Sequence, residues 1–293
     1  MSEVKEAIIL AGGMGSRMLP ASLYMPKETM PLVDTPILNH LIWEASKAGI
    51  EKIHLILSER KMAIIGNHLN KQSLFSDDVR PDLPIESLTL GAPGVEIVAH
   101  VQKSPGGVAD AISVAIKYIK GAFLVMLGDM VILERHLGPK HSGKDEASGA
   151  SIKLVSMYEK NGLPTVGVSK VEEEELVKYG VVDLQGEDVK EIIEKPSKGE
   201  APSDYILCGR YIMPGNTADI LRKYPINEYG ELQSIMLLRH FIKNGGLKAT
   251  KLDNMTVYDG GDPLSWLKSQ IDHALRRDDL SHDLSVWLRT KIE

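Results

Sequence analysis

The chain has 293 residues, of which 43% are hydrophobic and 25% are charged, and its formal net charge is −6. This composition is typical of a globular protein with enough apolar residues for a large core. The negative net charge argues against a protein that binds nucleic acid through a basic surface, so we expect no nucleic-acid partner. A local cluster of cations can still bind a small polyanionic substrate.

The sequence contains one cysteine, Cys208, so it cannot form an intrachain disulfide. This is typical of a reducing compartment, and the neighbours of Cys208 predict a buried thiol on a strand. No apolar stretch approaches the roughly 20 residues that span a bilayer. Residues 1–6 lack the apolar core of a signal peptide. We therefore expect a cytoplasmic protein with no membrane contact.

In the first half of the chain, apolar runs typical of buried strands alternate with segments of helical spacing. Thr35 and Pro36 have the pattern of a helix start, with Thr35 as the N-cap, and Gly49 is the stop. We expect strands at 7–10, 52–57, 95–101 and 122–129, and helices at 37–49, 62–71 and 109–119.

This β-α-β-α rhythm predicts an α/β fold, in which helices cover a parallel sheet. Ligands of such sheets bind beyond the carboxyl ends of the strands. The glycine loop after Leu10 and the carboxylate of Asp129 both follow strands. The sequence therefore predicts a functional site at this edge.

The second half has a more mixed pattern, with no repeat and no low-complexity linker. Asp262 and Pro263 are expected to cap a long final helical stretch. Residues 76–94 are interpreted as a surface excursion within one domain. We expect strands at 150–157, 166–171, 179–184, 189–195, 205–213, 247–252 and 256–259, and a helix at 230–246.

A glycine-rich loop follows the first strand. It lacks the P-loop pattern, and the dinucleotide fingerprint fails because Met18 stands where the third glycine, counted from Gly13, should be. The loop also contains prolines that prevent a long helix from following at once, at Pro20, Pro26 and Pro31. A long irregular loop of this kind can bring Arg17 and Lys27 together.

The stretch "LAGGMGSRMLPASLYMPKETMPLVDTPIL" resembles the signature of the sugar-1-phosphate nucleotidyltransferases. "HVQKSPGGVADAI" is similar to the base-recognition segment of that family, and "LVMLGDM" to its metal-binding Gly-Asp. "KYGVVD", "EIIEKP" and "YDGGD" resemble its later motifs. The matches run in order from residue 7 to about 290, and the pattern is nearest to the uridylyltransferase group of the family.

The resemblance implies a Rossmann-like three-layer α/β/α fold with a mixed, mainly parallel central sheet and C-terminal helices. It divides a single domain, 1–293, into a nucleotide-binding half (1–150), a sugar-binding half (151–262) and a helical tail (263–293). The implied reaction transfers a uridylyl group from UTP to glucose 1-phosphate, giving UDP-glucose and pyrophosphate. Relatives are commonly dimers or tetramers, so we expect a homo-oligomer.

The resemblance also implies the catalytic groups. Arg17 and Lys27 match the family's phosphate-binding cations, and Lys195 the lysine that meets the sugar phosphate. Asp129 matches a carboxylate that holds Mg²⁺, the expected cofactor, and Asp259 is the expected second ligand.

The remaining site residues follow from the same motifs. Glu194 and Gly180 are expected at the sugar together with Lys195. Glu194 and Lys195 would point to opposite sides of a strand unless the backbone bends there, and Pro196 favours a bend. The residues expected at the nucleotide are Ala11, Gly12, Gly13, Gly15, Gln102 and Gly107.

Two alternatives stay open. Asp110 stands where close relatives often carry His or Gln, and Leu23 where many uridylyltransferases have Lys. The base could therefore be thymine, which would make the protein a dTTP–glucose-1-phosphate thymidylyltransferase. A non-catalytic relative that binds sugar nucleotides is a weaker alternative, because the cations and carboxylates of the motifs are retained.

Overall fold

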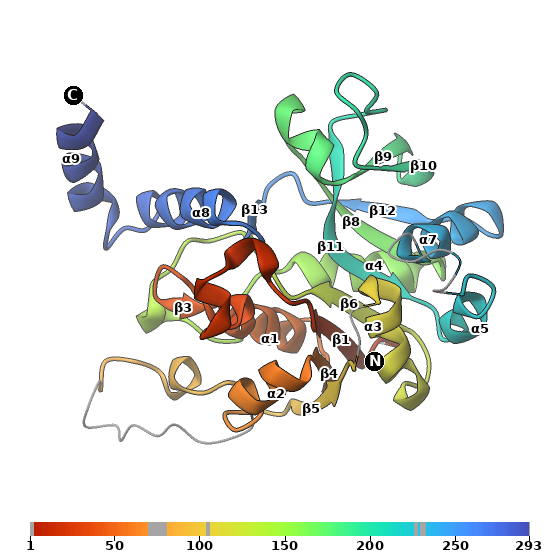
Figure 1. Cartoon of the computed structure of the whole chain (residues 1–293), viewed down its shortest axis with the longest axis horizontal. Helices are drawn as coiled ribbons and strands as arrows, with labels where there is room; N and C mark the ends of the chain where they lie inside the picture. The colour runs from red at the N-terminus through yellow and green to blue at the C-terminus, as the bar shows by residue number, and fades with distance from the viewer. Residues whose placement is uncertain (1–2, 70–80, 104–105, 226–227, 229–232, 293) are drawn as a thin grey trace.

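The computed structural model describes residues 3–69, 81–103, 106–225, 228 and 233–292. Its framework is a nine-stranded sheet (Figure 1). The strands lie side by side in the order β5 (Glu96–Val101), β4 (Lys52–Leu57), β1 (Glu6–Ala11), β6 (Phe123–Leu127), β11 (Tyr205–Met213), β8 (Thr165–Lys170), β12 (Lys248–Lys251), β10 (Asp188–Glu194) and β9 (Gly180–Gln185).

The sheet is mixed, and its two ends differ. From β5 to β6 all strands are parallel, as the βα rhythm predicts. From β6 onward the pairings are antiparallel except for that of β8 with β12. The expected mainly parallel sheet is therefore found only in the first half of the chain. Two small sheets pair β13 (Thr256–Asp259) with β7 (Met130–Leu133), and β2 (Pro31–Leu32) with β3 (Thr35–Pro36).

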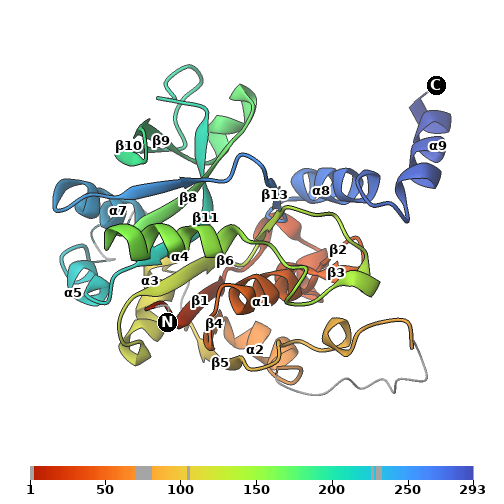
Figure 2. The same cartoon turned by 180° about the vertical axis from the view of Figure 1, so that it is seen from behind.

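Helices pack on both faces of the sheet. α1 (Ile37–Lys47) and α4 (Ala150–Asn161) contribute to one core cluster, whereas α3 (Gly107–Ala115), α5 (Thr217–Leu221) and α7 (Gln233–Lys243) contribute to the other. Figure 1 has α3 and α7 nearer to the viewer, and Figure 2 has α4 nearer. α2 (Glu59–Ile65) follows β4, and α8 (Pro263–Leu275) and α9 (Ser281–Ile292) extend away from the sheet.

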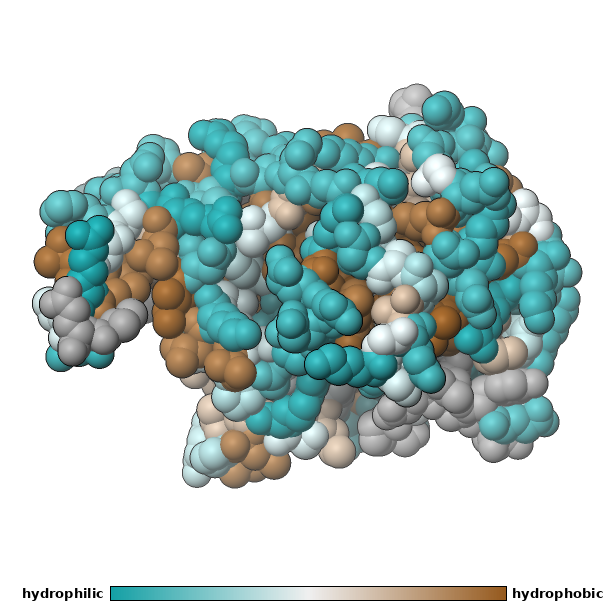
Figure 3. Space-filling model, turned by 90° about the horizontal axis from the view of Figure 1, so that it is seen from above, coloured by the Kyte–Doolittle hydropathy of each residue, from teal (hydrophilic) through white to brown (hydrophobic). Residues whose placement is uncertain are grey.

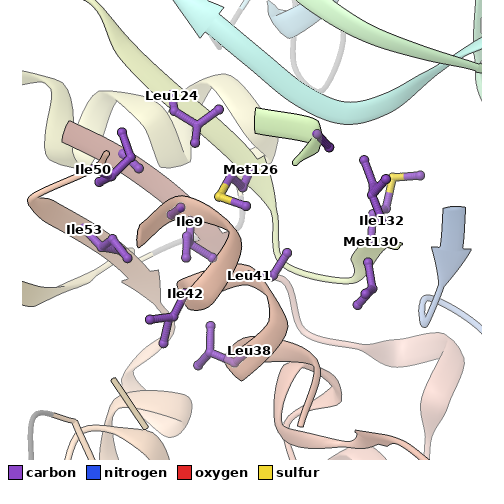
Figure 4. Close-up of a cluster of buried hydrophobic side chains, with 14 of the residues drawn as sticks. Ile9, Leu38, Leu41, Ile42, Ile50, Ile53, Leu124, Met126, Met130 and Ile132 are labelled. Carbon is purple, nitrogen blue, oxygen red and sulfur yellow. The ribbon is translucent and has the colours of Figure 1, made fainter. Parts of the chain in front are cut away.

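The two cores lie on opposite sides of the sheet because neighbouring residues of a strand point to opposite faces. On β1, Ile9 joins the cluster with α1 and Ile8 the cluster with α3. Both side chains are fully buried. The close-up in Figure 4 shows the first cluster, with Ile9, Leu38, Leu41, Ile42, Ile50, Ile53, Leu124, Met126, Met130 and Ile132.

A buried ion pair connects the two halves of the chain. Arg210 on β11 donates from Nε and Nη2 to the two carboxylate oxygens of Glu44 on α1, each at 2.9 Å. Arg210 Nη2 also donates to the carbonyl of Met130 at 3.0 Å, and Ser151 on α4 donates to Glu44 at 2.5 Å. Because every charge is matched by hydrogen bonds, this pair can be buried without leaving a lone charge.

Two sequence expectations are wrong. Residues 150–157 form the first part of helix α4 and not a strand: Ala150, Ser151, Leu154 and Val155 are buried, which is helical spacing. Thr35 does not cap a helix, because Thr35 and Pro36 form β3, and α1 begins at Ile37 without a side-chain cap.

Other elements are of the expected type, but some of their boundaries differ from the predicted ones. α2 begins at Glu59, earlier than expected, because the Ser58 hydroxyl accepts a hydrogen bond from the Lys61 amide, and the described helix ends at Ile65. The final helical stretch is capped by Asp262, as expected, but it is two helices. Cys208 is a free, buried thiol on β11. Parts of three expected segments lie outside the described residues, at 70–71, 76–80 and 230–232.

In the described part of the chain, no helix is long and apolar enough to cross a membrane.

We expect Gly209→Ala to destabilise the protein more than Gly186→Ala. Both glycines have positive φ (+72° and +67°), which costs an alanine about 1–2 kcal/mol. At Gly209 a Cβ would also lie 2.9 Å from Sδ of Met130 and 3.0 Å from Cβ of Leu127, whereas at Gly186 the space is open. Overpacking adds about 1–3 kcal/mol. Urea unfolding of both variants measures the difference, and equal losses would contradict the crowding described here.

Candidate active site

The glycine loop leaves β1 at the carboxyl edge of the sheet. Gly15 has φ +69°, in the left-handed region that favours glycine. Gly12 is buried, and a Cβ there would overlap the side-chain oxygen of Gln102. Gly13 is exposed, with no non-neighbouring atom within 4 Å of the position that a Cβ would take. The backbone at Gly13 is therefore open to a ligand.

Lys27 and Asp129 form an ion pair at this edge. Lys27 begins a 3-10 turn in the glycine loop, and Asp129 lies between β6 and β7. The two side chains are only 12% and 21% exposed. Burial alone would raise the pKa of Asp129, but the ammonium of Lys27 holds this pKa below its ordinary value. Asp129 is therefore a carboxylate at neutral pH.

Asp259 is brought beside Asp129 by strand pairing. It ends β13, where it stands opposite Met130 of β7, and the amide of Gly260 donates to the carbonyl of Asp129 at 2.8 Å. The Asp259 carboxylate accepts hydrogen bonds from the amide of Gly261 at 2.6 Å and from the hydroxyl of Tyr179 at 3.1 Å. Burial and the negative charge of Asp129 both raise the pKa of Asp259.

Arg17, in the glycine loop, reaches the same group of carboxylates. A Cβ placed on Gly261 would lie 3.0 Å from Nη2 of Arg17, 2.8 Å from Oδ1 of Asp259 and 3.4 Å from Oδ2 of Asp129. Glycine at position 261 therefore leaves room where a guanidinium and two carboxylates meet. Arg17 is exposed, so its charge is available to a ligand.

The two carboxylates fit a magnesium ion. Among the described residues, no group of three or more His, Cys, Asp or Glu side chains could hold a metal ion. Mg²⁺ does not need such a group, because it commonly takes one or two carboxylates and completes its octahedron with waters and phosphate oxygens. Asp129 and Asp259 repel each other, as the raised pKa of Asp259 indicates, and a divalent cation between them would relieve this repulsion.

A pocket of about 500 Å³ lies beside the glycine loop, and Gly12 and Gln102 line it. Gln102 follows β5 and is buried, with 8% of its surface exposed. Its amide nitrogen donates to the carboxylate of Asp110 at 2.5 Å. Gly107 begins α3 with φ +86°. The pocket wall also includes exposed apolar side chains of the glycine loop, Met14, Leu19 and Leu23.

A second pocket, of about 200 Å³, is lined by Gly180 and Glu194. Strand pairing places these two residues opposite each other on β9 and β10. A Cβ on Gly180 would lie 3.0 Å from Oε2 of Glu194, so glycine keeps the carboxylate accessible. The other walls include aromatic and aliphatic side chains such as Tyr179, Leu207 and Tyr211.

Lys195 stands at the end of β10 with φ +47°, an unusual value for a residue other than glycine. The backbone therefore bends there, as the adjacent Pro196 predicts. The bend brings Nζ of Lys195 to 3.7 Å from Oε1 of Glu194, and the lysine is 61% exposed. In this structure Lys195 pairs with Glu194 and not with the carboxylates of Asp129 and Asp259.

The structure thus divides the expected residues into three groups. Arg17, Lys27, Asp129 and Asp259 form a central charged cluster. Of the nucleotide candidates, Gly12 and Gln102 line the larger pocket, and Gly13 and Gly15 lie in the glycine loop. Ala11 is at the buried end of β1, and Gly107 begins α3 and does not line this pocket. The sugar candidates Gly180, Glu194 and Lys195 lie at the smaller pocket or next to it.

Sequence reasoning missed a buried pair beneath the glycine loop. Nζ of Lys61 on α2 donates to both carboxylate oxygens of Glu28, at 2.8 and 2.7 Å, and to the carbonyl of Ala11 at 2.8 Å. Both side chains are almost fully buried. Glu28 directly follows Lys27, so the pair fixes the loop next to the catalytic candidate. Lys61 belongs to no motif, and its sequence neighbours are those of an ordinary helix lysine. Only its contacts in the structure identify its role in holding the loop.

The chain is similar to known proteins over most of its length. A family model described as nucleotidyl transferase matches residues 6–267. Two proteins named UTP–glucose-1-phosphate uridylyltransferase, from Staphylococcus epidermidis and Staphylococcus haemolyticus, are 30% and 31% identical to the chain, over 99% of each sequence. The solved structure of UDP-glucose pyrophosphorylase from Acinetobacter baumanii has a TM-score of 0.78 and 24% identity, covering 99% of this chain and 100% of that one, so the fold is shared.

We expect Lys61→Met to destabilise the protein by about 3–5 kcal/mol, because it leaves Glu28 as a buried carboxylate without its partner. Burial raises the pKa of Glu28 even beside Lys61, and removing the ammonium takes away the charge that opposes this rise. The folded variant then binds more protons than the unfolded chain, and its stability falls as pH rises from 5 to 8. Urea unfolding at several pH values measures both effects.

The matched control is the double variant Lys61→Met with Glu28→Leu. It removes both charges and fills the space with apolar groups, which is often close to neutral. We expect it to recover most of the lost stability and to lose the added pH dependence. A double variant as unstable as the single one would contradict the buried-charge argument.

Proposed function

Because the chain belongs to the nucleotidyl transferase family, we propose that it is a UTP–glucose-1-phosphate uridylyltransferase. The observation that carries the proposal is the charged cluster of Arg17, Lys27, Asp129 and Asp259 at the carboxyl edge of the sheet. The names of the full-length relatives support UTP and glucose 1-phosphate as substrates and UDP-glucose as product.

In the proposed reaction, a phosphate oxygen of glucose 1-phosphate attacks the α-phosphorus of UTP. A new P–O bond forms, the bond from the α-phosphorus to the oxygen that bridges to the β-phosphate breaks, and pyrophosphate leaves with the electron pair. The nucleophile is already an anion, so little proton transfer is needed. The barrier lies in bringing two polyanions into line and in stabilising the charge of the transition state.

The residues of the cluster suit this task. Arg17 offers a planar guanidinium for the leaving β- and γ-phosphates, and Lys27 offers a compact ammonium beside the α-phosphate. The exposed backbone at Gly13 can donate to phosphate oxygens. Lys195 would leave Glu194 to meet the sugar phosphate, which its exposed position allows.

We propose that Asp129 and Asp259 hold Mg²⁺. When bound, the ion neutralises phosphate charge and orients the phosphate oxygens. Asp129 is held as a carboxylate by Lys27, so it can bind a cation at neutral pH. Tyr179 and the amide of Gly261 orient the carboxylate of Asp259.

The two pockets take the remaining parts of the substrates. We assign the base to the pocket of Gly12 and Gln102, with Gly107 nearby, and the sugar to the pocket of Gly180 and Glu194. Residues 1–150 would then form the nucleotide-binding half, 151–262 the sugar-binding half and 263–293 a helical tail. We also propose that the sheet and the helices on its two faces form the Rossmann-like three-layer arrangement that the resemblance implies.

Two expectations remain predictions: a cytoplasmic location, which rests on the cysteine usage and the apolar pattern of the sequence, and a homo-oligomer, which rests on the resemblance. The C-terminal helices expose Leu264, Leu267, Val286 and Trp287, each at least half exposed. Hydrophobic groups are visible at the left end of Figure 3, where Figure 1 places α8 and α9.

We expect Asp129→Asn to lower the rate of pyrophosphate release at least about 100-fold, because it removes the charge that is proposed to hold the cation. Asparagine retains the shape of the side chain, and thermal unfolding checks that the fold is intact. The control is Asp188→Asn, which removes a 46% exposed carboxylate at the opposite end of β10 from Glu194. Near-normal turnover of a folded Asp129→Asn variant would show that the metal site is misplaced.

A pyrophosphate-release assay with glucose 1-phosphate tests the base. We expect UTP to be used faster than dTTP, ATP, CTP or GTP, and only with Mg²⁺ present. Faster turnover of dTTP would change the assignment to a thymidylyltransferase and keep the reaction class. Absence of turnover with every nucleotide would overturn the proposed activity.

A further inference from the structure

The amide of Gln102 is held in one orientation in the larger pocket. Its nitrogen, Nε2, donates to Oδ2 of Asp110 at 2.5 Å. Its oxygen, Oε1, lies against Gly12, where a Cβ would overlap it. Gln102 is 8% exposed and lines the pocket. The two ends of the amide therefore have different and fixed neighbours.

Asp110 determines this orientation through its chemistry. A carboxylate has acceptors only, so it attracts the NH₂ end of an amide and repels the carbonyl end. Asp110 lies in the first turn of α3, where the partial positive charge of the helix N-terminus favours a negative side chain. Turning the amide over would place two acceptors against each other, which is unfavourable in a partly buried site.

The orientation matters because a glutamine side chain that can turn its amide over can form hydrogen bonds with either of two bases. The edge of uracil or thymine carries an N3–H donor and an O4 acceptor, so it matches an amide that presents its oxygen to N3 and its nitrogen to O4. Cytosine carries an N3 acceptor and an N4–H donor, and it matches the same amide turned over. The NH₂ group has two hydrogens, so one can bind Asp110 while the other remains for the base.

We propose that Asp110 is a positioning residue for base selection. It holds Gln102 in the orientation that accepts uracil or thymine, and it thereby rejects cytosine. This rests on the proposed function, because it requires a pyrimidine nucleotide in the pocket of Gly12 and Gln102.

The test is the UTP:CTP ratio of kcat/KM in Asp110→Asn. Asparagine can accept from Nε2 or donate to Oε1, so both orientations of Gln102 are allowed. We expect the ratio to fall at least about tenfold, mainly through better use of CTP. Asp219→Asn, which removes the same charge from an exposed position on α5, is the control and should leave the ratio unchanged. A ratio within twofold of the parent, in a folded Asp110→Asn variant, overturns the proposal.

The same substitution made in a Gln102→Leu variant shows whether Asp110 acts through Gln102. In Gln102→Leu no amide remains to be oriented, so adding Asp110→Asn should not change the UTP:CTP ratio further. A further change of the same size would overturn the proposal. Dissociation constants of UTP and CTP, measured by calorimetry without sugar phosphate, give the ratio for variants that do not turn over. If the parent protein binds UTP over CTP but releases no pyrophosphate, the proposed activity fails while the role of Asp110 is still tested.

Discussion

The buried contact of Lys61 with Glu28 and Ala11 is the constraint on which the site depends. It joins the end of β1, the loop that carries Lys27, and helix α2 at a single ammonium group. A long loop with several prolines has no hydrogen-bond ladder of its own, so its shape must come from such fixed points. The cost of burying two charges is offset because both oxygens of the carboxylate and the end of β1 accept from the lysine.

With the loop fixed, the charged cluster is assembled from distant segments by strand pairing. The parallel strands β1 and β6 end side by side, which places the loop next to Asp129. The small sheet of β7 and β13 then carries Asp259 to the same point from more than a hundred residues later. Glycines at 12, 180 and 261 leave the space that side chains would fill. The cations and carboxylates are thus concentrated where polyanionic substrates would meet.

Much of this was predictable because it follows from local pattern. In the sequence, two strand patterns are followed by a glycine loop and by Gly-Asp, and these signals predict the edge of the sheet where the site lies. Pro196 likewise predicts the bend at Lys195. At residues 150–157 the partly alternating polar and apolar residues predict a strand, whereas burial against α1 and the sheet favours the helix that is found. The Lys61–Glu28 pair had no local signal, since its partners lie 33 residues apart and each alone is typical of a solvated surface.

The position of β11 has a consequence for how the chain folds during synthesis. β11 lies in the middle of the sheet, between β6 and β8, although it begins only at Tyr205. Before β11 has been synthesised, one edge of β6 is unpaired and apolar, and this edge can pair with another nascent chain. The first half cannot complete its sheet by itself. The nine-stranded sheet is therefore completed across β6 only by a strand that lies far beyond it in the chain.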